Sequence, residues 1–258
     1  MSANVGDRTS EVLARLARVT DPELDESVTE LGFVTGVTID ASDRVTVGFR
    51  LPTYWCAANF AFLMADDMRR EVLDLPWVRG IGVELGEHMY AETINRAMML
   101  GQPFQEAFGA EADGDLDAVR RIFLVKAFQR RQLAVLDRLI AGGRTIDALL
   151  STTIGSVRGL APDAEGLRLI ERYLERRGVV GPAADDDLAF VDVDGHEVAP
   201  ADFTAHRRTL RRVAVNGEFN GALCRGLLSA RYGDDEREPN AEPTLLDFVR
   251  GSVPARVG

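Results

Sequence analysis

The feature that most limits the fold of this chain is the change of hydrophobic period within its first third. Two β-like runs, Phe33–Ile39 and Arg44–Leu51, are joined by a short segment of turn residues and therefore predict a hairpin. Helical spacing precedes this hairpin in Glu11–Val19 and follows it in Ala57–Leu75, and Trp77–Leu85 has the pattern of a third strand. The order α-β-β-α-β predicts a small α/β sandwich with its helices on one face of the sheet.

After residue 86 the spacing is almost entirely helical. An Asp-Gly pair between alternating apolar residues predicts one small hairpin over Ala189–Val198. We therefore expect an α+β protein with an α/β domain at residues 1–86 and a mostly helical domain with one β-hairpin at residues 87–258. The predicted helices of the second domain are Met89–Leu100, Leu116–Ala141, Ile146–Leu150, Pro162–Arg177, Phe203–Val213, Glu218–Arg231 and a last short one near Leu245–Arg250.

Composition narrows the setting in which the protein works. The chain has 258 residues, of which 46% are hydrophobic and 28% charged, as in a soluble globular protein. Two distant cysteines favour a reducing compartment, and no apolar run approaches the roughly 20 residues of a membrane span. A net charge of −11 argues against a nucleic-acid partner held by phosphate contacts. We expect a cytoplasmic protein with no membrane or nucleic-acid partner.

Cys56 is the first candidate for chemistry. It follows a strand and a Pro-containing turn, at the point where the next helix is predicted to begin. Free backbone N–H groups and the helix dipole stabilise a thiolate at such a position, and a thiolate can bind a soft metal or an iron–sulfur cluster. The structural alternative is a small apolar residue that fills the junction of helix and sheet. The other cysteine, Cys224, lies in a helical pattern among leucines and is expected to pack in a core.

Three segments, in this order, carry a family resemblance. Val19–Leu24 reads Val-Thr-Asp-Pro-Glu-Leu, Ser27–Val34 reads Ser-Val-Thr-Glu-Leu-Gly-Phe-Val, and Pro52–Cys56 opens a helix after the hairpin. Together they resemble the MIP18 family, the domain of unknown function 59 found in iron–sulfur assembly factors and in PaaD-like proteins of the phenylacetate pathway. The resemblance covers roughly residues 8–86. It implies that Cys56 is a transient ligand for iron or an iron–sulfur cluster.

Neighbours of Cys56 are candidates for supporting roles. Asp21 and Glu23 lie in a Pro-ordered turn that could approach the cysteine loop, either as hard ligands or to orient it; alternatively, they only shape the exit from the first helix. Thr53 and Tyr54 could hydrogen-bond the loop or the sulfur. Trp55, if exposed, is a candidate contact for a partner protein.

A weaker metal candidate lies outside this loop. His88 and Glu92 would share one face of a helix at the spacing i, i+4, which is compatible with one metal ion. Most such pairs are solvated helix faces. Because four thiolate-type ligands usually hold a cluster, a cluster at Cys56 would need a homodimer, ligands from a partner such as the iron–sulfur assembly machinery, or glutathione.

The second part of the chain carries a broader resemblance. Glu87–His88, Ile94–Asn95, Lys126–Gln132 and Leu223–Leu228 look like proteins encoded beside bacterial soluble di-iron monooxygenases and labelled metal–sulfur cluster biosynthetic proteins. This resemblance implies a helper in making an oxygenase. The sequence lacks the paired Glu-x-x-His motifs of a carboxylate-bridged di-iron bundle.

The expected function is an accessory maturation factor that assists iron or iron–sulfur centre assembly in a client, for which the broader resemblance suggests a soluble di-iron monooxygenase component. No catalytic residue is assigned, although a thiol-dependent activity at Cys56 stays open. The alternative is a metal-free adaptor or folding chaperone for an oxygenase component. It is favoured by Trp55 and Ala57, which flank Cys56 where the family usually has Gly and Pro.

Overall fold

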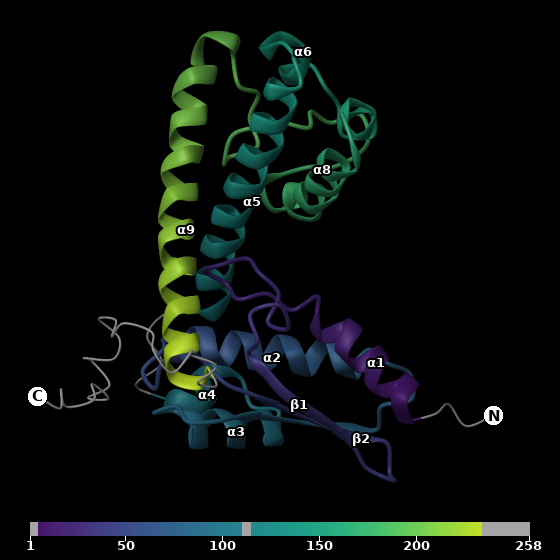
Figure 1. The fold of residues 1–258 in the computed structure, drawn as a ribbon, viewed down its shortest axis with the longest axis vertical. Helices are drawn as coiled ribbons and strands as arrows, with labels where there is room; N and C mark the ends of the chain where they lie inside the picture. Colours follow the sequence, from purple (N-terminus) through teal and green to yellow (C-terminus); the bar gives the residue numbers. More distant parts are fainter. Residues whose placement is uncertain (1–4, 110–114, 234–258) are drawn as a thin grey trace, which may run out of the picture.

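The structure, a computed structural model, describes residues 5–109 and 115–233, and its first part has the order of elements expected from the sequence (Figure 1). β2 is the central strand of three, antiparallel to β1 and parallel to β3. A parallel pair needs a crossover connection, and α2 supplies it. These elements are α1 (Val5–Leu16), β1 (Val34–Ile39), β2 (Arg44–Phe49), α2 (Ala58–Leu73) and β3 (Gly80–Leu85).

One face of this sheet is covered by α1 and α2 (Figure 1). Val45, Val47 and Phe49 alternate along β2 and are all buried, as the period of a half-buried strand requires. They share a core with apolar residues of both helices. The predicted sandwich is confirmed, although α1 begins earlier than expected, at Val5, because its polar first turn gives no hydrophobic period.

The first core extends past the predicted boundary at residue 86. Helices α3 (Ala91–Leu100) and α4 (Phe104–Phe108) pack on it, and Phe62 of α2 meets the ring of Phe104 edge-on at 5.3 Å between centroids. Asn95 of α3 hydrogen-bonds both the N–H and the carbonyl oxygen of Leu85 at the end of β3. Hydrophobic periodicity shows which face of a helix is apolar, but it does not show which core of the protein that face packs against.

A second, helical core lies around Phe128, Tyr173 and Phe190. Its two longest helices, α5 and α9, run side by side, and α9 returns toward the N-terminal domain (Figure 1). The helices are α5 (Leu116–Ala141), α6 (Ile146–Leu150), α7 (Ile154–Val157), α8 (Ala164–Arg177) and α9 (Phe203–Tyr232), with short 3-10 turns at Arg158–Leu160, Gly178–Val180 and Pro200–Asp202.

One prediction for this part is wrong, and another is met only in part. The segments Phe203–Val213 and Glu218–Arg231 are one continuous helix, α9, because Asn216 and Gly217 do not interrupt it. A glycine inside a helix costs about 1 kcal/mol relative to alanine, and long-range packing overrides this cost. In the expected hairpin, the ladder is reduced to a single isolated bridge between Val191 and Glu197.

Two further findings concern the last predicted helix and the expected absence of a membrane span. The helix predicted near Leu245–Arg250 lies outside the described residues. Within the described residues, none of the helices combines the length and the apolar character that crossing a membrane requires.

Candidate functional site

The loop between β2 and α2 places Cys56 at the surface of the N-terminal domain. Its side chain is half-buried, and the hydroxyl oxygen of Thr53 lies 3.1 Å from the sulfur. Ala57 occupies the N-cap position of α2 and offers no side-chain cap to the first turn of the helix. The N–H of Phe60 in the first turn donates to Oδ1 of Asn59, and the N-terminal end of a helix favours negative charge near it.

The segment that follows β3 fixes the main chain of this loop by hydrogen bonds. The Nε2 atom of His88 donates to the carbonyl oxygen of Cys56 across 2.8 Å, and the N–H of Met89 donates to the carbonyl oxygen of Tyr54 across 2.9 Å. The Nδ1 atom of His88 accepts from the N–H of Tyr90 at 3.2 Å, which fixes the neutral tautomer. Burial lowers the pKa of His88.

His88 therefore supports the loop through its backbone. It lies before α3 rather than on it, so the helical spacing proposed for His88 and Glu92 does not apply. Glu92 is exposed in the first turn of α3. A metal ion at His88 would have to displace one of the two hydrogen bonds of the ring.

The C-terminal end of α9 closes over one side of the same loop. Arg231 donates to the carbonyl oxygen of Glu87 at 2.9 Å and to that of Leu51 at 3.4 Å, and it pairs with the Glu87 carboxylate at 3.1 Å. The guanidinium of Arg50, at the end of β2, stacks over the ring of Tyr232 at 4.3 Å. The helical part of the chain thus contacts the cysteine loop directly.

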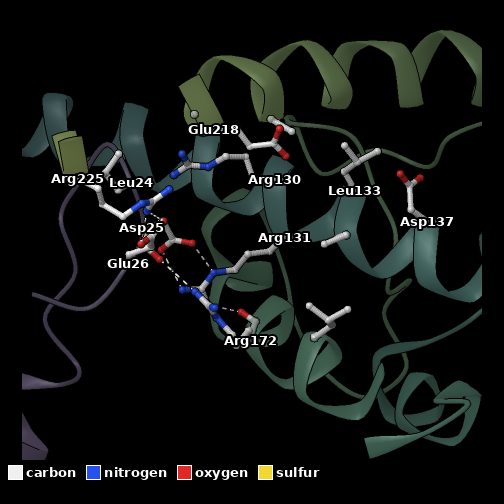
Figure 2. A pocket seen from close by; sticks show the side chains of 14 residues that line it. Leu24, Asp25, Glu26, Arg130, Arg131, Leu133, Asp137, Arg172, Glu218 and Arg225 are labelled. Atoms are coloured by element: carbon white, nitrogen blue, oxygen red, sulfur yellow. Dashed lines mark hydrogen bonds and ion pairs between the residues drawn. The ribbon is translucent and has the colours of Figure 1, made fainter. Parts of the chain in front are cut away.

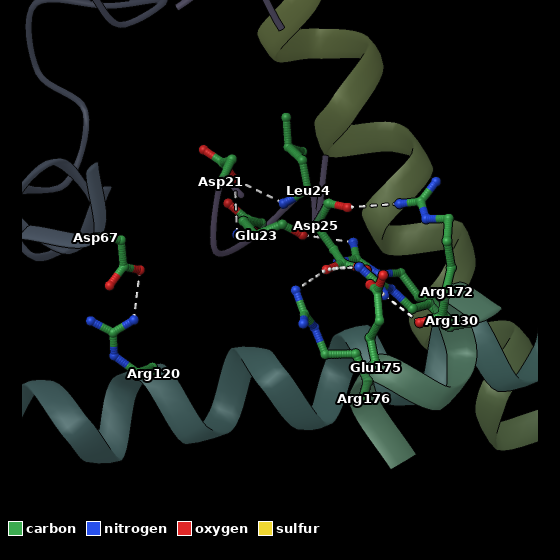
Figure 3. A network of polar contacts seen from close by, with 11 residues as sticks. Asp21, Glu23, Leu24, Asp25, Asp67, Arg120, Arg130, Arg172, Glu175 and Arg176 are labelled. Atoms are coloured by element: carbon green, nitrogen blue, oxygen red, sulfur yellow. Dashed lines mark hydrogen bonds and ion pairs between the residues drawn. The ribbon is translucent and has the colours of Figure 1, made fainter. Parts of the chain in front are cut away.

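The Asp21–Glu23 turn is fixed by different groups. Oδ1 of Asp21 accepts from the N–H groups of Glu23 and Leu24, both at 2.8 Å, and so caps its own turn (Figure 3). Burial raises the pKa of Asp21. The Glu23 carboxylate accepts from the side chain of Asn220 on α9 at 2.7 Å, and its carbonyl oxygen accepts from Arg130 on α5 at 2.6 Å.

Asp25, at the end of this turn, joins the two parts of the chain. Its carboxylate accepts two hydrogen bonds from Arg131 of α5, at 2.5 and 2.9 Å, and pairs with Arg176 of α8 at 3.3 Å. Figure 2 shows Asp25 facing Arg131 of α5. Asp25 also lines a cavity of about 420 Å³, together with Arg172 and Arg225. The charges around this cavity are mostly paired, which makes it a junction that holds the turn in place.

The aromatic residues beside Cys56 point outward. Trp55 is 73% exposed and Tyr54 is 51% exposed. Exposed aromatic side chains of this size are suited to contact with another protein. The exposed position of Trp55 is thus compatible with the prediction that it contacts a partner.

Cys224 was expected only to pack in a core, and its surroundings are more informative. It is half-buried on α9 and packs on the same first core as Cys56. Burial raises the pKa of Cys224 to about 11, and the negative charges of Asp21 and Glu23 act in the same direction. Sequence reasoning missed this convergence because only the packing of α9 across the N-terminal domain brings the residues together.

The first part of the molecule is thus a small α/β domain that presents one thiol in a braced surface loop. Residues 9–85, at the N-terminal end of the chain, match the family model described as iron–sulfur cluster assembly protein. The match confirms the resemblance found in the sequence and ends before α3. No curated protein matches the chain.

Proposed function

We propose that this protein is an accessory maturation factor that helps to install iron or an iron–sulfur centre in a client protein. The match of residues 9–85 to the iron–sulfur cluster assembly family supports a general role in cluster assembly. The observation that carries the proposal is the placement of Cys56 within that domain, in a loop whose backbone is held by His88. Such a loop keeps its shape while its sulfur stays reachable.

The chemistry asked of Cys56 is that of a transient ligand. A thiolate binds iron, and one protein thiolate leaves most coordination positions of the cargo for other ligands. The hydroxyl of Thr53 can donate to the sulfur and hold it in place. Asp21 and Glu23 support their own turn and its contact with α9 in this scheme, because their side chains are engaged there.

The client that we propose is a component of a soluble di-iron monooxygenase. This part of the proposal rests on the resemblance of the helical part to proteins encoded beside such enzymes. Trp55 and Tyr54, both exposed beside Cys56, are placed to contact the client during transfer. Co-expression tests it: client with full iron content and activity when co-expressed with Cys56→Ala would refute the role of the thiol.

A second candidate function is a metal-free adaptor or folding chaperone for an oxygenase component. The observation that favours it is the exposed indole of Trp55, adjacent to Cys56, in place of the glycine usual in the family. A thiol-dependent enzyme is less favoured, because the ring of His88 contacts the carbonyl oxygen of Cys56 rather than its sulfur.

One experiment separates these functions. The protein is purified anaerobically with ferrous iron and sulfide, and bound iron and visible absorption are compared for wild type, Cys56→Ala and Trp55→Ala. We expect Cys56→Ala to lose bound iron and Trp55→Ala to keep it while capturing less client. Equal and negligible iron in all three proteins would refute cargo handling and leave the adaptor.

A further inference from the structure

The cavity of about 420 Å³ beside Asp25 lies where the turn of residues 24–26 meets α5, α8 and α9, and the side chains that line it are drawn in Figure 2. Pockets that hold small molecules typically have volumes of about 300–1,000 Å³. Most of the lining residues lie beyond residue 85, outside the segment that matches the family. A ligand in this cavity would therefore contact both parts of the chain.

Part of the lining is apolar. It consists of Leu24 from the turn, Leu133 and Ala134 from α5, Leu169 from α8 and Ala214 from α9. An apolar group that packs against these side chains is removed from water together with them, which favours binding. This part of the lining thus favours a ligand with an apolar body.

The acidic part of the lining is mostly neutralised. Asp25 pairs with Arg131 at 2.5 Å, Glu26 with Arg225 at 2.8 Å and Asp137 with Arg207 at 2.7 Å. The fourth carboxylate, that of Glu218, is exposed on α9. Carboxylates that already have a cationic partner offer little attraction to a cation from solution, so the lining does not select a cation.

Two arginines of the lining, Arg130 and Arg172, have main-chain partners instead. Arg130 donates to the carbonyl oxygen of Glu23 across 2.6 Å, and Arg172 donates to that of Asp25 across 3.1 Å. Nη2 of Arg130 is buried and has no hydrogen-bond partner in the described part of the chain. Burial lowers the pKa of Arg130. A buried guanidinium N–H without an acceptor is costly, and an anion in the cavity would supply that acceptor.

We propose that this cavity binds a small organic carboxylate with an apolar body. The carboxylate accepts hydrogen bonds from Arg130 and Arg172, and the body packs against the apolar part of the lining. The planar guanidinium group is suited to this role because its N–H groups match the geometry of a carboxylate. The ligand binds as the anion, and no bond is formed or broken. The inference is independent of the proposed function, because the cavity is lined by other residues than the cysteine loop.

The test is a titration of the full chain with octanoate, followed by saturation-transfer NMR. Two further ligands separate the two parts of the proposal: octanamide keeps the chain without the charge, and acetate keeps the charge without the chain. The variants are Arg130→Gln, Arg172→Gln and Leu169→Phe, the last of which places a larger side chain in the lining. Arg121→Gln is the matched control, because Arg121 also lies on α5 and donates to a main-chain carbonyl oxygen but does not line the cavity.

We expect octanoate to bind wild type with a Kd of about 1 mM or tighter, and octanamide and acetate to bind about tenfold more weakly. Arg130→Gln should weaken octanoate binding by about tenfold, because it removes a charge-assisted hydrogen bond. Arg172→Gln should weaken it by about threefold, because Arg172 is exposed. Leu169→Phe should also weaken it, whereas Arg121→Gln and Cys56→Ala should bind as wild type does.

Several results would overturn the inference. They are the absence of octanoate binding to wild type, equal binding by Arg130→Gln and Arg121→Gln, and equal binding of octanoate and either of the other two ligands. Circular dichroism shows whether each variant is folded. If Arg130→Gln is not folded, the three ligands on wild type and the effect of Leu169→Phe decide, since neither depends on that variant.

Thermal melting gives a second readout that does not depend on NMR. Because the ligand binds only the folded chain, octanoate at ten times its wild-type Kd should raise the Tm of wild type by about 3 °C and that of Arg130→Gln by about 1 °C or less. An equal rise in the two proteins would place the ligand elsewhere and overturn the inference.

Discussion

The Nε2 atom of His88 lies 2.8 Å from the carbonyl oxygen of Cys56, and this hydrogen bond joins the segment that follows β3 to the cysteine loop. The ring is only 5% exposed and also accepts a hydrogen bond from the N–H of Tyr90. A buried histidine whose two ring nitrogens both hydrogen-bond backbone groups is a structural support. It fixes the loop while its ring makes no contact with the Cys56 sulfur.

Removing the hydrogen bonds of His88 should destabilise the N-terminal domain. His88→Phe fills the same space but leaves two backbone groups without a partner, so it should lower the free energy of unfolding by about 1–3 kcal/mol. Urea unfolding followed by tryptophan emission measures it, since both tryptophans, Trp55 and Trp77, lie in this domain. Glu92→Ala, at a nearby exposed site, is the control and should change little. Unchanged stability of His88→Phe would show that the cysteine loop does not depend on the hydrogen bonds of His88.

The junction between the two parts predicts a larger effect. Asp25 and Arg131 are 7% and 8% exposed in their side chains, and Asp25→Asn would leave Arg131 and Arg176 without their buried counter-charge. Breaking one partner of such a buried pair costs about 3–5 kcal/mol. Asn keeps the shape and accepts the positive φ of 55° at this position.

An exposed pair gives the control for Asp25→Asn. Glu165 pairs with Arg168 within one turn of α8, with side chains 47% and 69% exposed, so Glu165→Ala should cost less than about 1 kcal/mol. Chemical denaturation followed by circular dichroism compares the two variants. Equal small losses in both would mean that the two parts of the chain are held together mainly by apolar contacts.

Local periodicity predicted the elements whose residues carry their own signal. The bounds of α5 and α6 agree with the predicted ones, Leu116–Ala141 and Ile146–Leu150, because their caps and apolar stripes are local. The strands around the hairpin were found for the same reason. Cys56 was identified from its place in a turn before a helix, which is also a local property.

The parts that sequence reasoning missed depend on packing between distant segments. Nothing near Cys224 in the sequence indicates that α9 crosses the N-terminal domain, since the partners of α9 there are Glu23 and Leu51. His88 was read as a helical residue because its contact with the loop of Cys56 is equally non-local. The continuity of α9 through Gly217 has the same origin.

Replacing two glycines of α9, Gly217 and Gly226, by alanine should change stability in opposite directions. A Cβ atom on Gly217 would lie 2.3 Å from Nη1 and 2.9 Å from Cδ of Arg130, which itself donates to the carbonyl oxygen of Glu23. Gly217→Ala should therefore lower Tm, although alanine is the better helix former. Gly226 of the same helix has open space around its Cα, so Gly226→Ala should stabilise by up to about 1 kcal/mol. Thermal melting compares both variants, and a rise of Tm in both would show that Arg130 moves away freely.

The contact between α5 and α9 predicts a pH dependence. Nε2 of His206 lies 2.7 Å from Oε1 of Gln132, and burial lowers the pKa of His206. The unfolded chain therefore takes up a proton near pH 6.5 that the folded chain does not, so stability is full above this pH and falls below it. Urea unfolding at pH 7.5 and 5.5 should show this loss, and His206→Gln should reduce it. His196→Gln, at a side chain that is 76% exposed, is the control and should keep the wild-type dependence. An unchanged pH dependence in His206→Gln would mean that other groups, such as His88, account for it.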